Sequence, residues 1–100
     1  MYNEKIKFTW CESKRLQNLK KHGLDFADAF KVFGEPLALS EDIREDYGEQ
    51  RMIALGLLGS LVVFVVHVES DDEIRIISMR EAEPYEADYY YRTVGYFRQG

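Results

Sequence analysis

The stretch RMIALGLLGSLVVFVVHVESDDEIRIISMR, residues 51–80, contains three apolar runs separated by two short polar segments. Its middle run, Leu61–Val68, is an almost unbroken series of Val, Leu and Phe, the types that suit a buried, pleated surface. Gly59–Ser60 before it and Ser70–Asp72 after it are typical of tight turns. The pattern therefore predicts an antiparallel meander with Leu61–Val68 as its central strand.

Polar side chains interrupt this predicted sheet. His67 breaks the middle run, while Arg75, Ser78 and Arg80 lie among the apolar residues of the last run. A buried Arg or His is costly without a partner, so these residues either carry function or, for the two arginines, face solvent. Alternation along a strand points Arg75 to one face and Ser78 with Arg80 to the other. A single site that uses all three therefore needs a bulge or a strand end.

The segment before the meander predicts an edge strand and two helices. The edge strand is expected at Ile6–Trp10, followed by a helix over Glu12–His22 with a capping oxygen from Ser13. A second helix is expected after Asp25, because apolar residues recur there at helical spacing. We expect four apolar side chains of this helix to pack on the sheet as part of the core: Phe26, Ala29, Phe30 and Phe33.

The remaining segments are shorter. Leu37–Ser40 suits a further strand, and Glu41–Gln50 reads as a polar loop or hairpin arm with solvated carboxylates. Glu83–Pro84 can open a final helix that ends near Gly95, since Pro is tolerated at the first helical position. Residues 95–100 are expected to form a short tail.

Composition limits the classes of protein. One hundred residues suit one domain, and a hydrophobic content of 46% argues for a folded chain. We expect a cytoplasmic protein, because no apolar run approaches the ~20 residues of a membrane helix and no signal peptide is recognisable. The single Cys11 and two histidines make a weak case for a metal site, so no metal or cofactor is expected.

The charge pattern bears on nucleic-acid binding. A net charge of -5 counts against general affinity for a phosphate backbone. However, residues 13–24 contain no acidic residue, and they hold a set of cationic or titratable side chains: Lys14, Arg15, Lys20, Lys21 and His22. A basic strip on an acidic protein is therefore possible.

Three short motifs resemble one known family. Lys21-His22-Gly23, then Gly48-Glu49-Gln50-Arg51, then Ile74-Arg75-Ile76-Ile77-Ser78 with Arg80 are similar, in order and spacing, to the BrnT-type toxins of bacterial toxin-antitoxin pairs, within the RelE-like ribonuclease group. The resemblance covers roughly residues 8–90. It implies an α+β domain with an antiparallel sheet packed against two N-terminal helices and a C-terminal helix.

The same resemblance implies a function. It implies a metal-independent endoribonuclease that cleaves cellular RNA, arrests growth and needs no cofactor. The implied partner is a ribbon-helix-helix antitoxin, BrnA-like, which blocks the toxin and alone contacts operator DNA. The competing hypothesis, favoured by the acidic balance, is a noncatalytic module or corepressor that keeps the toxin fold.

Chemistry suggests roles for the matched residues. RNA cleavage without metal requires proton transfer and stabilisation of phosphate charge. His22 could transfer a proton, and Arg51, Arg75 and Arg80 could clamp phosphate oxygens. Lys21 could add a point charge, and Glu49 could be a base or an orienting group. Ser78 could support the site, and His67 could support it or, equally, be a core histidine.

Some features point away from catalysis or depart from the family pattern. Lys21 and His22 can also be explained as cations that complement the dipole at the end of a helix. Glu81–Glu86 is acidic where relatives are usually basic, which should weaken RNA attraction there. Arg80 at a strand end and His22 at a helix terminus are both expected to be accessible.

Overall fold

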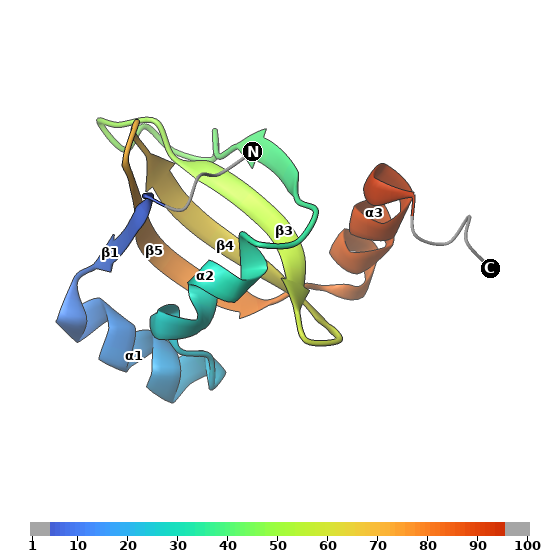
Figure 1. Cartoon of the computed structure of the whole chain (residues 1–100), viewed down its shortest axis with the longest axis horizontal. Coiled ribbons are helices and arrows are strands. Elements are labelled where there is room, and N and C mark those ends of the chain that lie inside the picture. Colours follow the sequence, from blue (N-terminus) through green and yellow to red (C-terminus); the bar gives the residue numbers. More distant parts are fainter. Residues whose placement is uncertain (1–4, 96–100) are drawn as a thin grey trace.

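The computed structural model describes residues 5–95, and the predicted tail beyond Gly95 lies outside that range. Within it, the sheet strands are β1 (Lys7–Trp10), β2 (Ala38–Glu41), β3 (Met52–Leu58), β4 (Leu61–Glu69) and β5 (Glu73–Glu81). The helices are α1 (Glu12–His22), a 3₁₀ turn over Phe26–Asp28, α2 (Ala29–Val32) and α3 (Pro84–Val94). The sheet has the order β1-β5-β4-β3-β2, with α3 set apart from α1 and α2 (Figure 1).

The predicted meander is confirmed, and β4 is its central strand. β3, β4 and β5 pair antiparallel in sequence order, and β2 adds to the outer edge of β3. The predicted edge strand β1 joins the other side of the sheet, where it runs parallel to β5. The fold is therefore α+β with a mixed sheet. The sequence did not predict the parallel pairing, because the apolar pattern of an edge strand does not encode its direction.

A β-bulge in β5 decides which side chains share a face. Ser78 pairs with Val66 and Ile76 pairs with His67, so Ile77 is the extra residue. Arg75 and Arg80 pair with Val68 and Phe64, which lie on the same face of β4 as Val66. Arg75, Ser78 and Arg80 therefore project from one face of the sheet. The expectation from simple alternation, that Arg75 faces the opposite side, was wrong for this reason.

Each face of the sheet carries its own apolar core. Phe26, Ala29, Val32 and Phe33 cover one face, where they pack against strand residues such as Val65. On the other face, α3 buries Tyr90 against Leu55, Phe64 and Val66. The Tyr90 hydroxyl donates a hydrogen bond of 2.9 Å to the Pro36 carbonyl, which satisfies the one polar atom of that buried ring.

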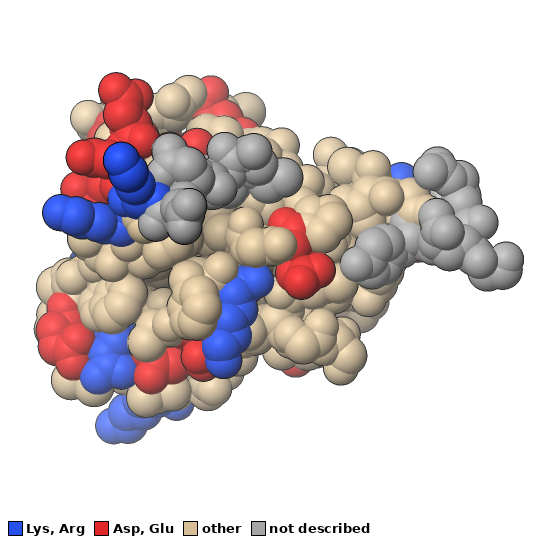
Figure 2. All heavy atoms as spheres, in the orientation of Figure 1, with Lys and Arg blue, Asp and Glu red and all other residues tan. Residues whose placement is uncertain are grey.

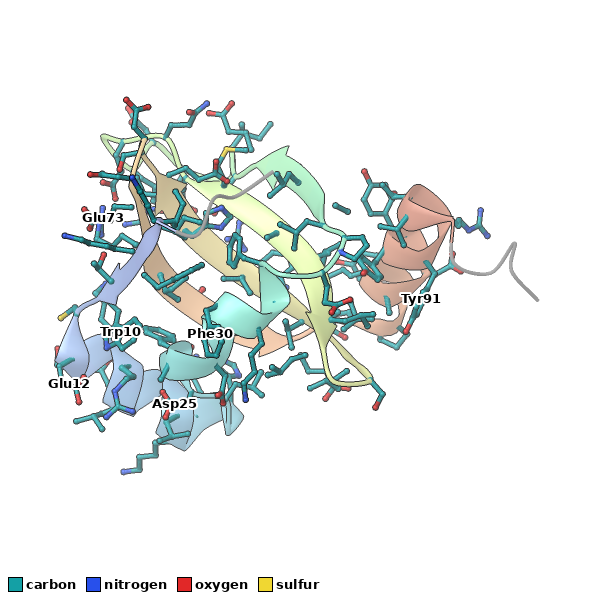
Figure 3. All side chains as sticks on the ribbon, viewed as in Figure 1. Trp10, Glu12, Asp25, Phe30, Glu73 and Tyr91 are labelled. Atoms are coloured by element: carbon teal, nitrogen blue, oxygen red, sulfur yellow. The ribbon has the colours of Figure 1, made fainter. Side chains whose placement is uncertain are left out.

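The second helix is shorter than predicted. It begins as a 3₁₀ turn capped by Asp25, whose carboxylate accepts the Ala27 N–H at 2.9 Å. The tighter turn changes the angular spacing of the following side chains. As a result Phe30 is 55% exposed on the outer side of α2, although it was expected in the core (Figure 3).

Two local predictions near polar groups were also wrong. The N-cap of α1 is Cys11, and no side chain caps that helix; Ser13 instead contacts the Cys11 sulfur at 3.2 Å. Asp42, expected to be solvated, has a side chain only 1% exposed and is bound by Arg44 and Tyr47. The α3 start follows the prediction, with Pro84 in the first turn and a capping box between Glu83 and Glu86.

Candidate functional site

The face of β5 that carries Arg75, Ser78 and Arg80 is the first half of the candidate site. Ser78 lies between the two arginines in the strand order, and the bulge at Ile77 is what aligns all three. The loop before β3 brings Glu49 to the same region. Its carboxylate accepts a hydrogen bond from Arg75 at 2.6 Å and a weaker one from Arg51 at 3.3 Å.

Glu49 therefore holds two of the predicted phosphate ligands. The hydrogen bond from Arg75 is the main cause that keeps the pKa of Glu49 below its usual range. A carboxylate with a lowered pKa is a poor proton acceptor, which favours the orienting role over that of a general base in the free protein. Arg51 is fixed further by its position over the Tyr47 ring, 4.2 Å from the centroid.

Arg80 is held more tightly than Arg75. Its guanidinium donates to both carboxylate oxygens of Glu86, at 2.9 and 3.1 Å, and to the Glu81 carbonyl at 3.1 Å. It also lies over the Phe64 ring at 3.9 Å. The Arg80 side chain is 28% exposed and that of Arg75 42% exposed. The expectation that Arg80 is accessible was wrong for most of its side chain, because α3 folds its capping carboxylate back onto the strand.

The electrostatic environment of Glu86 explains this pairing. Burial raises the pKa of a carboxyl, but here the hydrogen bonds from Arg80 and from the Glu83 N–H outweigh burial and keep the pKa of Glu86 below its usual range. Glu86 is thus an anion that links β5 to the first turn of α3. This pair belongs to the architecture as much as to the site.

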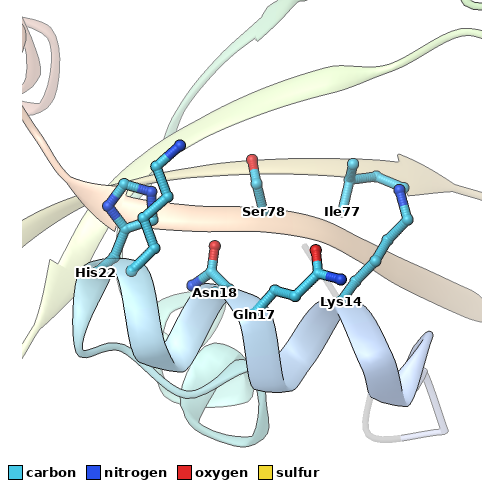
Figure 4. A pocket seen from close by; sticks show the side chains of 7 residues that line it. Lys14, Gln17, Asn18, His22, Ile77 and Ser78 are labelled. Carbon is cyan, nitrogen blue, oxygen red and sulfur yellow. The ribbon is translucent and has the colours of Figure 1, made fainter.

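The second half of the candidate site is a hollow between α1 and β5. It is lined by polar and cationic side chains of the helix together with two residues of the bulge: Lys14, Gln17, Asn18, Lys21, His22, Ile77 and Ser78. Figure 4 shows Lys14 and His22 at opposite ends of it, with Ile77 and Ser78 across from the helix. Ser78 therefore joins the hollow to the arginine face. His22 and Lys21 are exposed, as predicted for His22.

Asn18 fixes α1 against the strand. β1 pairs with β5 only as far as Ile76, so the outer edge of β5 is open beyond that residue. There the Asn18 amide donates to the Met79 carbonyl at 2.8 Å, and its oxygen accepts the Met79 N–H at 3.1 Å. This role of Asn18 was not predicted from the sequence. Its helical spacing from Lys14 and Lys21 was the available signal, since i, i+4 and i+7 share a face.

The structure leaves His67 apart from these groups. It is fully buried on the opposite face of the sheet. Its ring lies edge-to-face with that of Phe33, with the two centroids 4.9 Å apart, and its Nε2 lies 2.8 Å from the Glu69 carboxylate. That position matches the core alternative. Lys21, His22 and Ser78 line the hollow. Glu49 joins Arg51 and Arg75 in a separate group, and Arg80 lies further along β5.

The surface charge is mixed. On the face drawn in Figure 2, Lys and Arg side chains alternate with Asp and Glu and form no broad basic area. Between residues 5 and 95, no group of three or more His, Cys, Asp or Glu side chains is arranged to hold a metal ion. No helix in that range is long and apolar enough to cross a membrane.

Comparison with known proteins gives two findings. A family model described as "Ribonuclease toxin, BrnT, of type II toxin-antitoxin system" matches residues 10–86. The crystal structure of the Brucella abortus ribonuclease toxin BrnT is similar, with 31% sequence identity and a TM-score of 0.60, over 78% of this chain and 97% of that chain. A search of curated proteins gave no match.

Proposed function

The chain belongs to the BrnT family of ribonuclease toxins of type II toxin-antitoxin systems, and from this we propose that it is an endoribonuclease that cleaves cellular RNA without a metal ion. We further propose that it acts in the cytoplasm, arrests growth and is neutralised by a ribbon-helix-helix antitoxin of the BrnA type. In this proposal the antitoxin alone contacts operator DNA.

The single observation that carries the proposal is the bulge at Ile77. It puts Arg75 and Ser78 on one face of β5, and Ser78 also lines the hollow that holds Lys21 and His22. A guanidinium and an imidazole thus border the same short segment of strand. These are the groups that phosphate binding and proton transfer require.

The proposed roles follow from accessibility and pairing. Arg75 binds a phosphate of the RNA strand, because it is the more exposed arginine of β5 and has a single carboxylate partner. Lys21 adds a point charge, and His22 transfers a proton to or from the 2′-hydroxyl or the leaving 5′-oxygen. Glu49 holds Arg75 and Arg51 in place until phosphate competes for them. Arg80 is a positioning residue that keeps this end of β5 joined to α3.

The test uses the purified chain freed of any partner. Incubated with RNA and a chelator, the wild-type protein is expected to cleave, and His22→Ala is expected to lose 10²-fold or more in rate, the usual contribution of a proton-transfer group. Lys20→Ala is the matched control, because Lys20 is on the same helix but does not line the hollow. Induced expression of wild type and control should stop growth, whereas His22→Ala should not.

The noncatalytic alternative has one observation in its favour. Arg51, Arg75 and Arg80 each bind a carboxylate of the chain itself, which reduces their positive charge toward RNA. If folded wild-type protein leaves RNA intact while it binds a small DNA-binding partner tightly, the chain is an interaction module and the enzyme proposal is wrong.

A further inference from the structure

We infer that the end of the hollow formed by Lys14 and Gln17 is a subsite for a second phosphate of the RNA strand, separate from the phosphate that is cleaved. The inference rests on the proposed function, because it assumes that His22 and Lys21 mark the reacting end. It adds two residues to the binding surface and predicts that the protein prefers an extended single strand to a dinucleotide.

The hollow follows one side of α1. Lys14, Gln17, Asn18 and Lys21 follow each other at helical spacing on one side of α1, and all line the hollow. Lys14 and His22 are eight residues apart, which is about 12 Å along the helix axis. Successive phosphates of a stacked strand are about 3.4 Å apart along its axis, so this length accommodates more than one phosphate. Figure 4 shows the Lys14 and His22 side chains at the two ends.

The cationic side chains of α1 differ in their ion pairs. Among residues 5–95, Lys14 and Lys21 form no ion pair, whereas Arg15 on the same helix is bound by Glu12 at 2.7 Å and Asp25 at 3.0 Å. The basic strip predicted from the sequence is therefore divided. Arg15 joins α1 to the next segment through Asp25. The lysines that line the hollow have no such carboxylate partner among the described residues, so their charge is available to a ligand.

The lining of the hollow also includes neutral polar groups. Between the lysines, the hollow offers the Gln17 amide from the helix and the Ser78 hydroxyl from β5. These neutral donors suit phosphate and ribose oxygens, as in nucleic-acid interfaces where most hydrogen bonds go to the backbone. The apolar part of the lining is Ile77, the extra residue of the bulge. Such a surface binds the backbone of a strand and carries little base selectivity.

The test measures binding and cleavage separately. An octanucleotide with 2′-O-methyl riboses cannot be cleaved, and its dissociation constant is measured over a range of salt concentrations for wild type, Lys14→Gln and Lys20→Gln. Loss of one phosphate contact should reduce the slope of log K against log salt by ~0.7 for a single strand. We expect that reduction for Lys14→Gln and no change for Lys20→Gln, with equal melting temperatures for all three.

Cleavage supplies the second measurement. Lys14→Gln should lower kcat/KM for an unmodified octanucleotide through KM, and leave cleavage of a dinucleotide unchanged. Equal slopes for Lys14→Gln and Lys20→Gln would overturn the subsite, and so would an equal loss on dinucleotide and octanucleotide, which would put Lys14 at the cleaved phosphate. If no RNA is cleaved but the slope still falls for Lys14→Gln, the proposed function fails and the subsite remains as an RNA-binding surface.

Discussion

The Arg80→Ala variant tests whether this arginine holds the fold together. Its removal leaves the Glu86 carboxylate, which is 10% exposed, with the Glu83 N–H as its main remaining donor. Removing one partner of a fully buried pair costs about 3–5 kcal/mol, and the 28% exposure of Arg80 reduces this to about 2 kcal/mol. For a chain of this size that corresponds to a fall in melting temperature of about 10 °C.

The assay is thermal unfolding at neutral pH, with Arg75→Ala as the matched control on the same face of β5. Because Arg75 is more exposed, the Arg75→Ala variant should have the same melting temperature as the wild type. Acid titration adds a second readout. The pKa of Glu86 is lowered in the folded state, so the stabilisation is present above the usual carboxyl pKa and lost as pH falls through the folded value. Arg80→Ala should lose less stability on acidification. A variant that melts like the wild type would refute the reasoning.

Three further predictions follow from single contacts. Asp42→Asn should cost ~2 kcal/mol at neutral pH, because hydrogen bonds from Arg44 lower the pKa of Asp42 to about 2; the difference from wild type should vanish as pH falls from about 4 to 2, as measured by urea unfolding. Gly56→Ala should destabilise by roughly 1–3 kcal/mol in the same assay, because the new Cβ would lie 2.8 Å from the Val32 Cγ1 in the core. Tyr90→Phe should cost about 1 kcal/mol in chemical denaturation by removing the hydrogen bond to the Pro36 carbonyl, and an unchanged midpoint would contradict that assignment.

The sequence predicts the meander because its signals are local. Runs of β-branched residues between Gly-Ser and Ser-Asp-Asp turns define β4 and its neighbours. The Glu12–His22 helix ends at Gly23, whose φ of 73° is a left-handed conformation that glycine adopts without strain. The bulge has no such signal. Ile76 and Ile77 are equally apolar, and only pairing with Val66 and His67 decides which of them is the extra residue.

The residue types of the candidate site follow from the sequence, but the pairings between them do not. Motif order singles out Lys21, His22 and Arg75 as candidates, but the partners of the arginines depend on contacts between distant segments, such as Glu49 with Arg75. Asp42 looked solvated because its neighbours in sequence are acidic, whereas Arg44 folds back over it. Tertiary contacts of this kind decide whether a charged residue is a ligand or a structural anchor.

Under the proposed function, charge pairing also determines how this acidic chain binds RNA. Lys14 and Lys21, without ion pairs among residues 5–95, supply the attraction that is felt before contact. Arg75 becomes available only when a phosphate displaces Glu49 from it. That exchange removes the main cause of the low pKa of Glu49 and places a negative phosphate beside it, and both effects raise the pKa of the carboxyl. Under the proposed function, Glu49 is therefore an arginine clamp in the free protein and becomes a better proton acceptor once RNA is bound.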